Sequence, residues 1–336
     1  MNRTTVHGGA LRRAAASVAA GALATLLLAI AAGPASASPH LRARVFDGTL
    51  LISGSPFADQ ITLRLSATVR DQLELDLDND GSADATFDLA NIDAIDVDAG
   101  RGDDTVRVDD VNGVLTTPTR IDGGNGDDTL NGGGGAEILV GGNGNDRIDG
   151  NGGADTAFLG RGDDTFVWDP GDGSDVVEGG VGSDTMVFNG SGGNEIMAAT
   201  ANFGRVSFTR NLGTIAMDLN GIESIDVRAL GGTDTVTVND LSGTDLNRVN
   251  VDLASALGGS TGDGLADTVA VNGTKGDDSI AAVADGGAVE VRGLAALVRV
   301  THADPASDSL VIDPVIGADK VSVDPAVNAL IQVTVL

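Results

Sequence analysis

A short phrase of glycine and aspartate recurs at a nearly constant period between Gly123 and Val187. Its acidic position advances in steps of 9, 9, 9, 9, 11 and 9 residues, and an apolar residue follows each acid two places later. A fixed period indicates a solenoid, in which each unit buries its apolar side only against its neighbours. The acids are Asp128, Glu137, Asp146, Asp155, Asp164, Asp175 and Asp184, and the apolar residues are Leu130, Leu139, Ile148, Ala157, Phe166, Val177 and Met186.

The unit from Gly141 to Asp149 illustrates the local structure that the phrase predicts. Glycines in three of its first four places allow a tight loop whose carbonyl oxygens point inward. Asp146 adds a carboxylate, and Ile148 then lies on the inner face of a short strand. If each unit is half a turn of a coil, units 18 residues apart stack about 4.8 Å from one another. One edge then carries Asp128, Asp146 and Asp164, and the other carries Glu137, Asp155 and Asp175.

Loops lined with oxygen atoms suit calcium. This ion takes about 6 to 8 oxygen ligands, more than one loop can supply, so two stacked loops must share each ion, giving roughly three to five sites. The longer side chain of Glu137 fits such a loop less well than aspartate does. The candidate calcium-binding residues are Gly123, Asn125, Asp128, Gly141, Asn143, Asp146, Gly150, Gly152, Asp155, Arg161, Asp164 and Asp175.

These units resemble the RTX, or hemolysin-type, calcium-binding nonapeptide repeats, whose pattern is Gly-Gly-x-Gly-x-Asp-x-apolar-x. The resemblance covers Gly123 to Val187, with isolated copies near Gly100 and Gly273. It implies that the loop carbonyls and the aspartate of each unit bind calcium. It also implies the fold class: an all-β protein with a parallel β-roll, flanked here by β-rich repeat modules.

The flanking sequence is itself repetitive. The passage from Ile92 to Asp104 recurs at a constant offset of 130 residues, and a third, shorter version begins at Val271. A β-rich module is thus present two and a half times around the central array. The single phrases at Asp104, Asp234 and Asp278 lack an evident stacking partner, so a structural turn explains them as well as an ion site does.

The first residues indicate export. Arg3, Arg12 and Arg13 precede an apolar run from Ala14 to Ala32, and Ala35-Ser36-Ala37 follows this run. The pattern is typical of a secretory signal peptide cleaved before Ser38. The predicted organisation is a signal peptide (1–37), an N-terminal β module (38–120), the RTX β-roll (121–188), a second β module that duplicates the first (189–270) and a partial third module (271–336).

A second acidic pattern lies in the N-terminal module. The residues from Asp76 to Gly81, followed by Asp84, match the opening of an EF-hand calcium loop. However, Phe87 stands where that loop has a bidentate glutamate, and the flanking residues are strand-like. A solvated hairpin turn and an accessory cation site both remain open.

Composition narrows the possible partners. The net charge of −29 repels nucleic acid and anionic lipid and attracts cations. The chain has no cysteine, so an exported protein of this sequence lacks disulfide bonds. We therefore expect a secreted, extracellular protein that folds on binding Ca²⁺, binds no nucleic acid and inserts into no membrane after signal cleavage. Any cell-surface or extracellular partner is unknown.

The sequence gives little support for catalysis. It has no His-Glu-x-x-His motif, and the Gly258 to Gly262 stretch has the spacing of a nucleophile elbow without its strand-turn-helix setting. Paired carboxylates would suit a glycosidase, but Trp168 and eight Phe are the whole aromatic supply. We expect no enzyme activity. The alternatives are a secreted hydrolase or polysaccharide-modifying enzyme that carries an RTX array, and a calcium-dependent adhesin.

Overall fold

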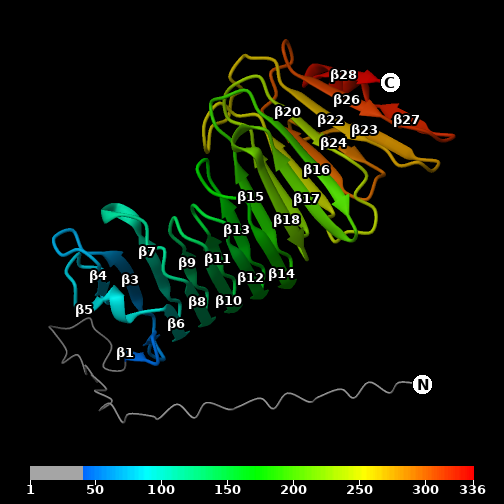
Figure 1. The fold of residues 1–336 in the computed structure, drawn as a ribbon. Coiled ribbons are helices and arrows are strands. Elements are labelled where there is room, and N and C mark those ends of the chain that lie inside the picture. Colours follow the sequence, from blue (N-terminus) through cyan, green and yellow to red (C-terminus); the bar gives the residue numbers. More distant parts are fainter. Residues whose placement is uncertain (1–40) are drawn as a thin grey trace, which may run out of the picture.

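The computed structural model describes residues 41–336, so the predicted signal peptide lies outside the described residues. These residues form two large β-sheets that face each other across an apolar interior along an elongated body (Figure 1). The prediction of an all-β fold with a parallel β-roll is confirmed. Helical structure in residues 41–336 is restricted to short 3₁₀ segments, and none could span a membrane. They are η1 (Leu89–Asn91), η2 (Asp110–Asn112), η3 (Leu212–Thr214) and η4 (Pro325–Ala329).

The first sheet, sheet A, contains 14 strands and is mostly parallel. In spatial order they are β1 (Arg42–Phe46), β2 (Thr49–Ser53), β6 (Ala94–Arg101), β8 (Thr119–Asn125), β10 (Glu137–Asn143), β12 (Thr156–Arg161), β14 (Val176–Val181), β18 (Ile215–Asn220), β17 (Arg205–Arg210), β16 (Ile196–Asn202), β20 (Thr235–Val238), β22 (Thr268–Asn272), β26 (Ser309–Asp313) and β28 (Gln332–Val335).

The second sheet, sheet B, also contains 14 strands. In spatial order they are β27 (Lys320–Val323), β23 (Ser279–Asp285), β24 (Ala288–Arg292), β25 (Leu297–Thr301), β21 (Arg248–Asp252), β19 (Ser224–Arg228), β15 (Thr185–Asn189), β13 (Thr165–Trp168), β11 (Arg147–Asp149), β9 (Thr129–Asn131), β7 (Thr105–Asp109), β3 (Gln60–Leu65), β4 (Gln72–Asp76) and β5 (Ala85–Asp88).

The central coils alternate between the two sheets, one strand in each sheet per turn. In sheet A, Ile138 pairs in parallel with Thr156, and in sheet B, Arg147 pairs with Thr165, which gives the predicted repeat of 18 residues per coil. The pairing of Thr156 with Val176 shows that the next coil accommodates two extra residues without loss of register.

The predicted apolar positions line the interior in continuous rows. Leu130, Ile148 and Phe166 pair across β9, β11 and β13 and are fully buried. In sheet A, the small side chain of Ala157 occupies one of these inward-facing positions. Leu159, two residues later in the same strand, is also fully buried and adds apolar volume to the interior at that coil. The interior is therefore one side-chain layer thick per sheet, and each coil depends on its neighbours for burial.

Three antiparallel excursions interrupt the parallel stacking, one in each predicted β module. They are β3–β4–β5, β16–β17–β18 and β23–β24–β25. The passage predicted to be duplicated has the same local structure in both places, but β6 lies in sheet A and β19 in sheet B. The second copy is thus displaced by half a turn of the coil.

Candidate metal centre

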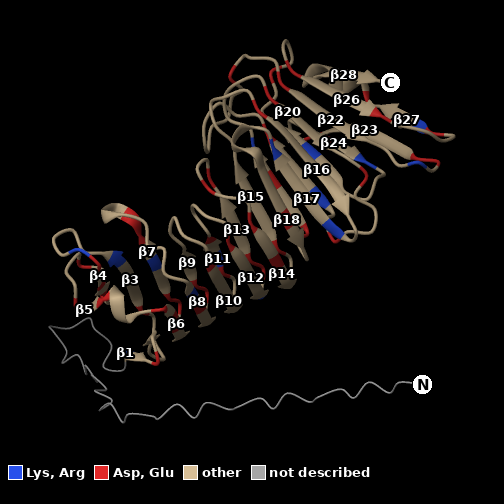
Figure 2. Ribbon diagram, in the orientation of Figure 1, with Lys and Arg blue, Asp and Glu red and all other residues tan. Residues whose placement is uncertain are grey.

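Acidic residues at the starts of successive sheet B strands form a ladder along the roll. We call Asp59, Asp104, Asp128, Asp146, Asp164, Asp184 and Glu223 the B ladder. A carboxylate oxygen of each of the last six accepts a hydrogen bond from the backbone N–H of the ladder residue before it, at 2.7–3.0 Å. Figure 2 shows that acidic residues recur from one central coil to the next.

A second ladder runs before the strands of sheet A. We call Glu137, Asp155, Asp175, Glu195, Asp234, Asp267 and Asp308 the A ladder. The same bond joins Glu137 to Asp155 at 2.7 Å and Asp155 to Asp175 at 2.9 Å. Strands β17 and β18 then interrupt the ladder, and it resumes from Glu195 to Asp308 at 2.8–3.0 Å.

Most ladder carboxylates have only one oxygen engaged. The other oxygen is buried and has no hydrogen-bond partner. A buried polar atom left unpaired costs on the order of 1–3 kcal/mol, more if charged, so each such oxygen marks a position that a cation would stabilise. These oxygens are Oδ2 of Asp104, Asp128, Asp146, Asp155, Asp164, Asp175, Asp184 and Asp234, and Oε1 of Glu137.

In the repeats that begin at Gly123, Gly141 and Gly150, the first glycine makes room for the unpaired oxygen. A Cβ atom on Gly123 or Gly141 would lie 2.4 Å from Oδ2 of the aspartate five residues later, and a Cβ on Gly150 would lie 2.5 Å from Oδ2 of Asp155. Any side chain at these positions would therefore fill the space in front of the carboxylate. An oxygen-only donor set in a glycine-walled space fits calcium.

In the central repeats that carry a B ladder aspartate, two further glycines permit the coils to stack. Gly142 and Gly144 have φ of +115° and +133°, which disfavours side chains. A Cβ on Gly144 would also lie 1.9 Å from the carbonyl oxygen of Gly126 in the preceding coil. The glycine-rich phrase therefore serves both the backbone angles and the close approach of neighbouring loops.

Burial raises the pKa of those ladder carboxylates that keep an unpaired oxygen. Desolvation, with repulsion from nearby acids, raises the pKa of Asp146 to about 7 and that of Asp155 to about 8, although the N–H bond that each accepts favours the charged form. The pKa values of Asp104 and Asp234 are raised to about 7 for the same reasons. In the absence of a cation, the ladders therefore bury carboxylate charge that has no counter-charge nearby.

The predicted residues Asn125, Asn143 and Arg161 align in one row at the ends of β8, β10 and β12. Their backbone carbonyl oxygens each accept the N–H of a glycine in the preceding coil, at 2.8–2.9 Å. Each carbonyl retains a second lone pair. The side chains of Asn125 and Asn143 are exposed and bond to each other at 3.1 Å.

Glu137 occupies the first position of the A ladder. Its longer side chain turns back into its own loop, where Oε2 accepts the N–H of Gly133 at 2.9 Å. Its Oε1 is buried and unpaired, as in the aspartates. Gly152 lies in the loop before Asp155, where a Cβ would approach the Cα of Gly134 at 3.4 Å.

The expectation that Asp104, Asp234 and Asp278 lack stacking partners is wrong. The backbone N–H of Asp278 donates to Oδ1 of Asp319 at 2.8 Å. Asp104 stacks between Asp59 and Asp128, and Asp234 lies between Glu195 and Asp267. Sequence reasoning also omitted Asp184 from the candidate set. The shared triplet of Asp, Thr and an apolar residue would have identified three of these acids: it occurs as Asp104-Thr105-Val106, Asp184-Thr185-Met186 and Asp234-Thr235-Val236.

In three acids, two of them ladder residues, both carboxylate oxygens accept hydrogen bonds from the acid's own loop. We call these acids closed, because no oxygen is left for an ion. At the start of each excursion, a hydroxyl residue four places earlier donates both its backbone N–H and its hydroxyl to the acid. The N–H bonds are 2.6–3.0 Å and the hydroxyl bonds 2.9–3.1 Å. None of these acids has a buried unpaired oxygen among the residues described. The pairs are Ser55 with Asp59, Ser191 with Glu195, and Thr274 with Asp278.

Comparison with known families agrees with the geometry. The RTX calcium-binding nonapeptide repeat matches this chain in four copies, over residues 120–136, 131–166 and 171–186. No curated protein matches the chain. The matched residues are the central coils that carry the half-paired carboxylates. The central coils of the chain are therefore RTX calcium-binding repeats.

Proposed function

We propose that this chain is an exported structural protein whose central roll folds when calcium binds between its stacked coils, and which has no catalytic activity of its own. The observation that carries the proposal is the row of buried carboxylates, each with one oxygen paired and one unpaired. The paired oxygen sets the spacing of the coils. The unpaired oxygen is left for the ion.

We assign the ions to the gaps between neighbouring loops on each edge. On the B edge, the ligands are the carboxylates of Asp128, Asp146 and Asp164 and the loop backbone at Gly123, Asn125, Gly141, Asn143 and Arg161. On the A edge, they are the carboxylates of Asp155 and Asp175 and the loop backbone at Gly150 and Gly152. The present structure adds Asp104, Glu137, Asp184 and Asp234 as further candidates, because each has an unpaired buried oxygen.

Folding on binding follows from the energetics of the calcium-free roll. Its interior is thin, so the free energy gained by hydrophobic burial is small. This gain has to offset both the loss of chain entropy on folding and the free-energy cost of burying the ladder carboxylates. Calcium binds the stacked loops and not the extended chain, so its binding free energy adds to the free energy of folding. Such a switch suits export, because calcium is scarce in the cytosol and abundant outside the cell.

A calcium titration tests the proposal. Metal-stripped protein, residues 38–336, is titrated with calcium while far-UV circular dichroism and the fluorescence of Trp168, the sole tryptophan, are recorded. We expect β-structure to appear and the emission of Trp168 to shift to shorter wavelength, because this side chain is fully buried in the folded protein. Spectra that do not change with calcium would rule out the proposed folding switch.

A further inference from the structure

The hairpin loop between β4 and β5 gathers three carboxylates far from the central coils. One oxygen from each of Asp76, Asp78 and Asp84 lies within 4.8 Å of the others. The loop joins the last two strands at the N-terminal end of sheet B, where β5 is the edge strand (Figure 1). Neither ladder includes these residues.

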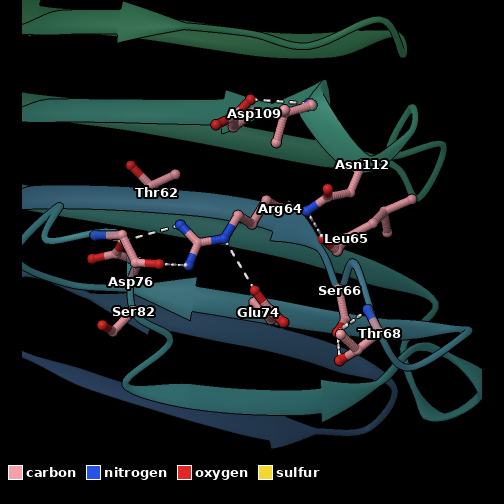
Figure 3. A network of polar contacts seen from close by, with 12 residues as sticks. Thr62, Arg64, Leu65, Ser66, Thr68, Glu74, Asp76, Ser82, Asp109 and Asn112 are labelled. Atoms are coloured by element: carbon pink, nitrogen blue, oxygen red, sulfur yellow. Dashed lines mark hydrogen bonds and ion pairs between the residues drawn. The ribbon is translucent and has the colours of Figure 1, made fainter.

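Asp76 supplies an independent indication of a ligand. Its side chain is fully buried, and its Oδ2 accepts hydrogen bonds from Arg64 and from the backbone N–H of Gly81, both at 3.0 Å. Its Oδ1 is buried without any partner. Figure 3 shows Arg64 between Asp76 and Glu74. A charged oxygen in this state is costly unless a cation or donor meets it.

The loop holds its acids in place through its own backbone. Asn79 and Gly81 adopt left-handed angles, with φ of +53° and +86°, which reverse the chain. Asp84 Oδ2 accepts the N–H of Leu77 at 2.8 Å, which ties the end of the loop to its start. Asp80 does not join the group; its Oδ1 instead accepts the N–H of Ser82 at 2.7 Å.

The charge balance also favours a cation. Arg64 pairs with Glu74 and with Oδ2 of Asp76, and it donates to the carbonyl of Gly81 at 2.8 Å. It therefore supports the loop through Oδ2, and Oδ1 of Asp76 remains free. Asp78 and Asp84 have no ion-pair partner among the described residues. Two converging carboxylates and one unpaired oxygen thus lack a counter-charge.

We propose that this loop is a second, separate calcium site, in which Asp76, Asp78 and Asp84 provide carboxylate oxygens. These residues stand at positions 1, 3 and 9 of an EF-hand-like loop. Phe87, at the twelfth position, pairs with Leu73 within the sheet and packs against the core, so it provides no ligand. The ion fastens the β4–β5 hairpin at the exposed end of sheet B. With Asp80 outside the group and no ligand at the twelfth position, the site binds with Kd on the order of 10⁻⁴–10⁻³ M, as extracellular modules do.

The test compares Asp84→Asn with Asp71→Asn in the whole mature chain. Asparagine at position 84 can still accept the N–H of Leu77 but loses the charge. Asp71 is an exposed acid in the β3–β4 turn with φ of +56°, an angle that asparagine tolerates, so the control makes the same chemical change nearby. Hydrogen exchange of the peptide covering residues 72–88 is measured by mass spectrometry with 10 mM calcium and with chelator.

We expect calcium to slow exchange in this peptide about tenfold in the unaltered chain and in Asp71→Asn, as a site with Kd of about 1 mM requires at that concentration. In Asp84→Asn the slowing should be absent. Equal slowing in all three proteins would overturn the proposal, because protection would then come from the rest of the fold.

The response of Trp168 fluorescence to calcium separates this site from the central coils. It should be retained in Asp84→Asn, which also shows that the variant folds. If that variant does not fold, Asp78→Asn replaces it in the same hydrogen-exchange comparison, and we expect the same loss of slowing. A chain that loses the Trp168 response but keeps hairpin protection would contradict the folding switch and support the hairpin site.

Discussion

Asp146 and Asp128 are joined across neighbouring coils through one oxygen only: Oδ1 of Asp146 accepts the backbone N–H of Asp128 at 2.8 Å, while Oδ2 is buried and unpaired. Asp164 has the same relationship to Asp146. Each carboxylate thus sets the coil spacing with one atom and leaves the other for a cation. A substitution that keeps the hydrogen bond but removes the charge can separate the two roles.

Asp146→Asn makes that separation. The amide oxygen can still accept the N–H of Asp128, but the ligand loses its charge. We expect the calcium midpoint of the folding transition to rise by about tenfold or more, equivalent to roughly 1.4 kcal/mol. The measurement is the circular dichroism titration. Asp127→Asn is the matched control, because Asp127 is exposed and Asn145 fills the same place in the next coil. Similar midpoints for the two variants would contradict the role assigned to Asp146.

Gly144→Ala should prevent stacking of the central loops. The new Cβ would meet the carbonyl oxygen of Gly126 at 1.9 Å, and no rotamer can relieve a clash with backbone. We expect a loss of about 3 kcal/mol or more in unfolding free energy at saturating calcium. Gly171→Ala isolates the backbone strain, because Gly171 has a similar φ of +127° but no atom within 4 Å of its Cβ position, and should cost about 1–2 kcal/mol. Chemical denaturation distinguishes the two, and equal losses would argue against the steric explanation.

The calcium-free roll should become more stable on acidification. Desolvation raises the pKa of Asp146 from 3.8 to about 7 and that of Asp155 to about 8, so the folded state binds more protons than the unfolded chain across this range. Folding is therefore favoured as the pH falls through these values and disfavoured above them. We expect resin-stripped protein to show more β-structure by circular dichroism at pH 5 than at pH 8.

Saturating calcium should reverse this trend, because protons compete with the ion for the same oxygens. The midpoint of the calcium titration should rise on acidification. A calcium-free protein that loses structure between pH 8 and pH 5 would contradict the assignment of raised pKa values to the folded ladders.

The ion pair of Glu195 and Arg210 should stabilise the second excursion. Both side chains are buried, and Arg210 also lies 5.2 Å from the ring centroid of Trp168. Glu195→Gln leaves the guanidinium without its counter-charge, which we expect to cost about 3–5 kcal/mol. Urea unfolding at saturating calcium measures the change. Asp71→Asn, which removes the exposed partner of Arg70, should change stability by about 0.5 kcal/mol or less. A similarly small effect in Glu195→Gln would show that Arg210 gains access to water.

The local pattern predicted most of the central roll. Within the array, a constant coil of 18 residues places Leu130, Ile148 and Phe166 in one buried row, as the period requires. It also predicted the carboxylates of Asp128, Asp146 and Asp164 on one edge. The sequence could not show that each carboxylate has one paired and one unpaired oxygen, because the paired oxygen bonds to the backbone of another coil.

The full length of the ladders could not be predicted from the sequence for a different reason. Stacked acids are 18 residues apart in the centre, but Glu195 and Asp234 are separated by 39 residues and Asp267 and Asp308 by 41, since excursions of varying length lie between them. No fixed period marks such a contact.

The sequence alone therefore determined the coil, its apolar interior and the preference for calcium, because glycine, acid and apolar residue act within a single repeat. Only the tertiary structure decided which acids join a ladder. It also showed that Asp104 and Asp234, which the sequence leaves as isolated copies, are stacked and half-paired. The physical reason is that pairing a carboxylate depends on the backbone stacked beside it, and strand register, not sequence distance, sets that neighbour.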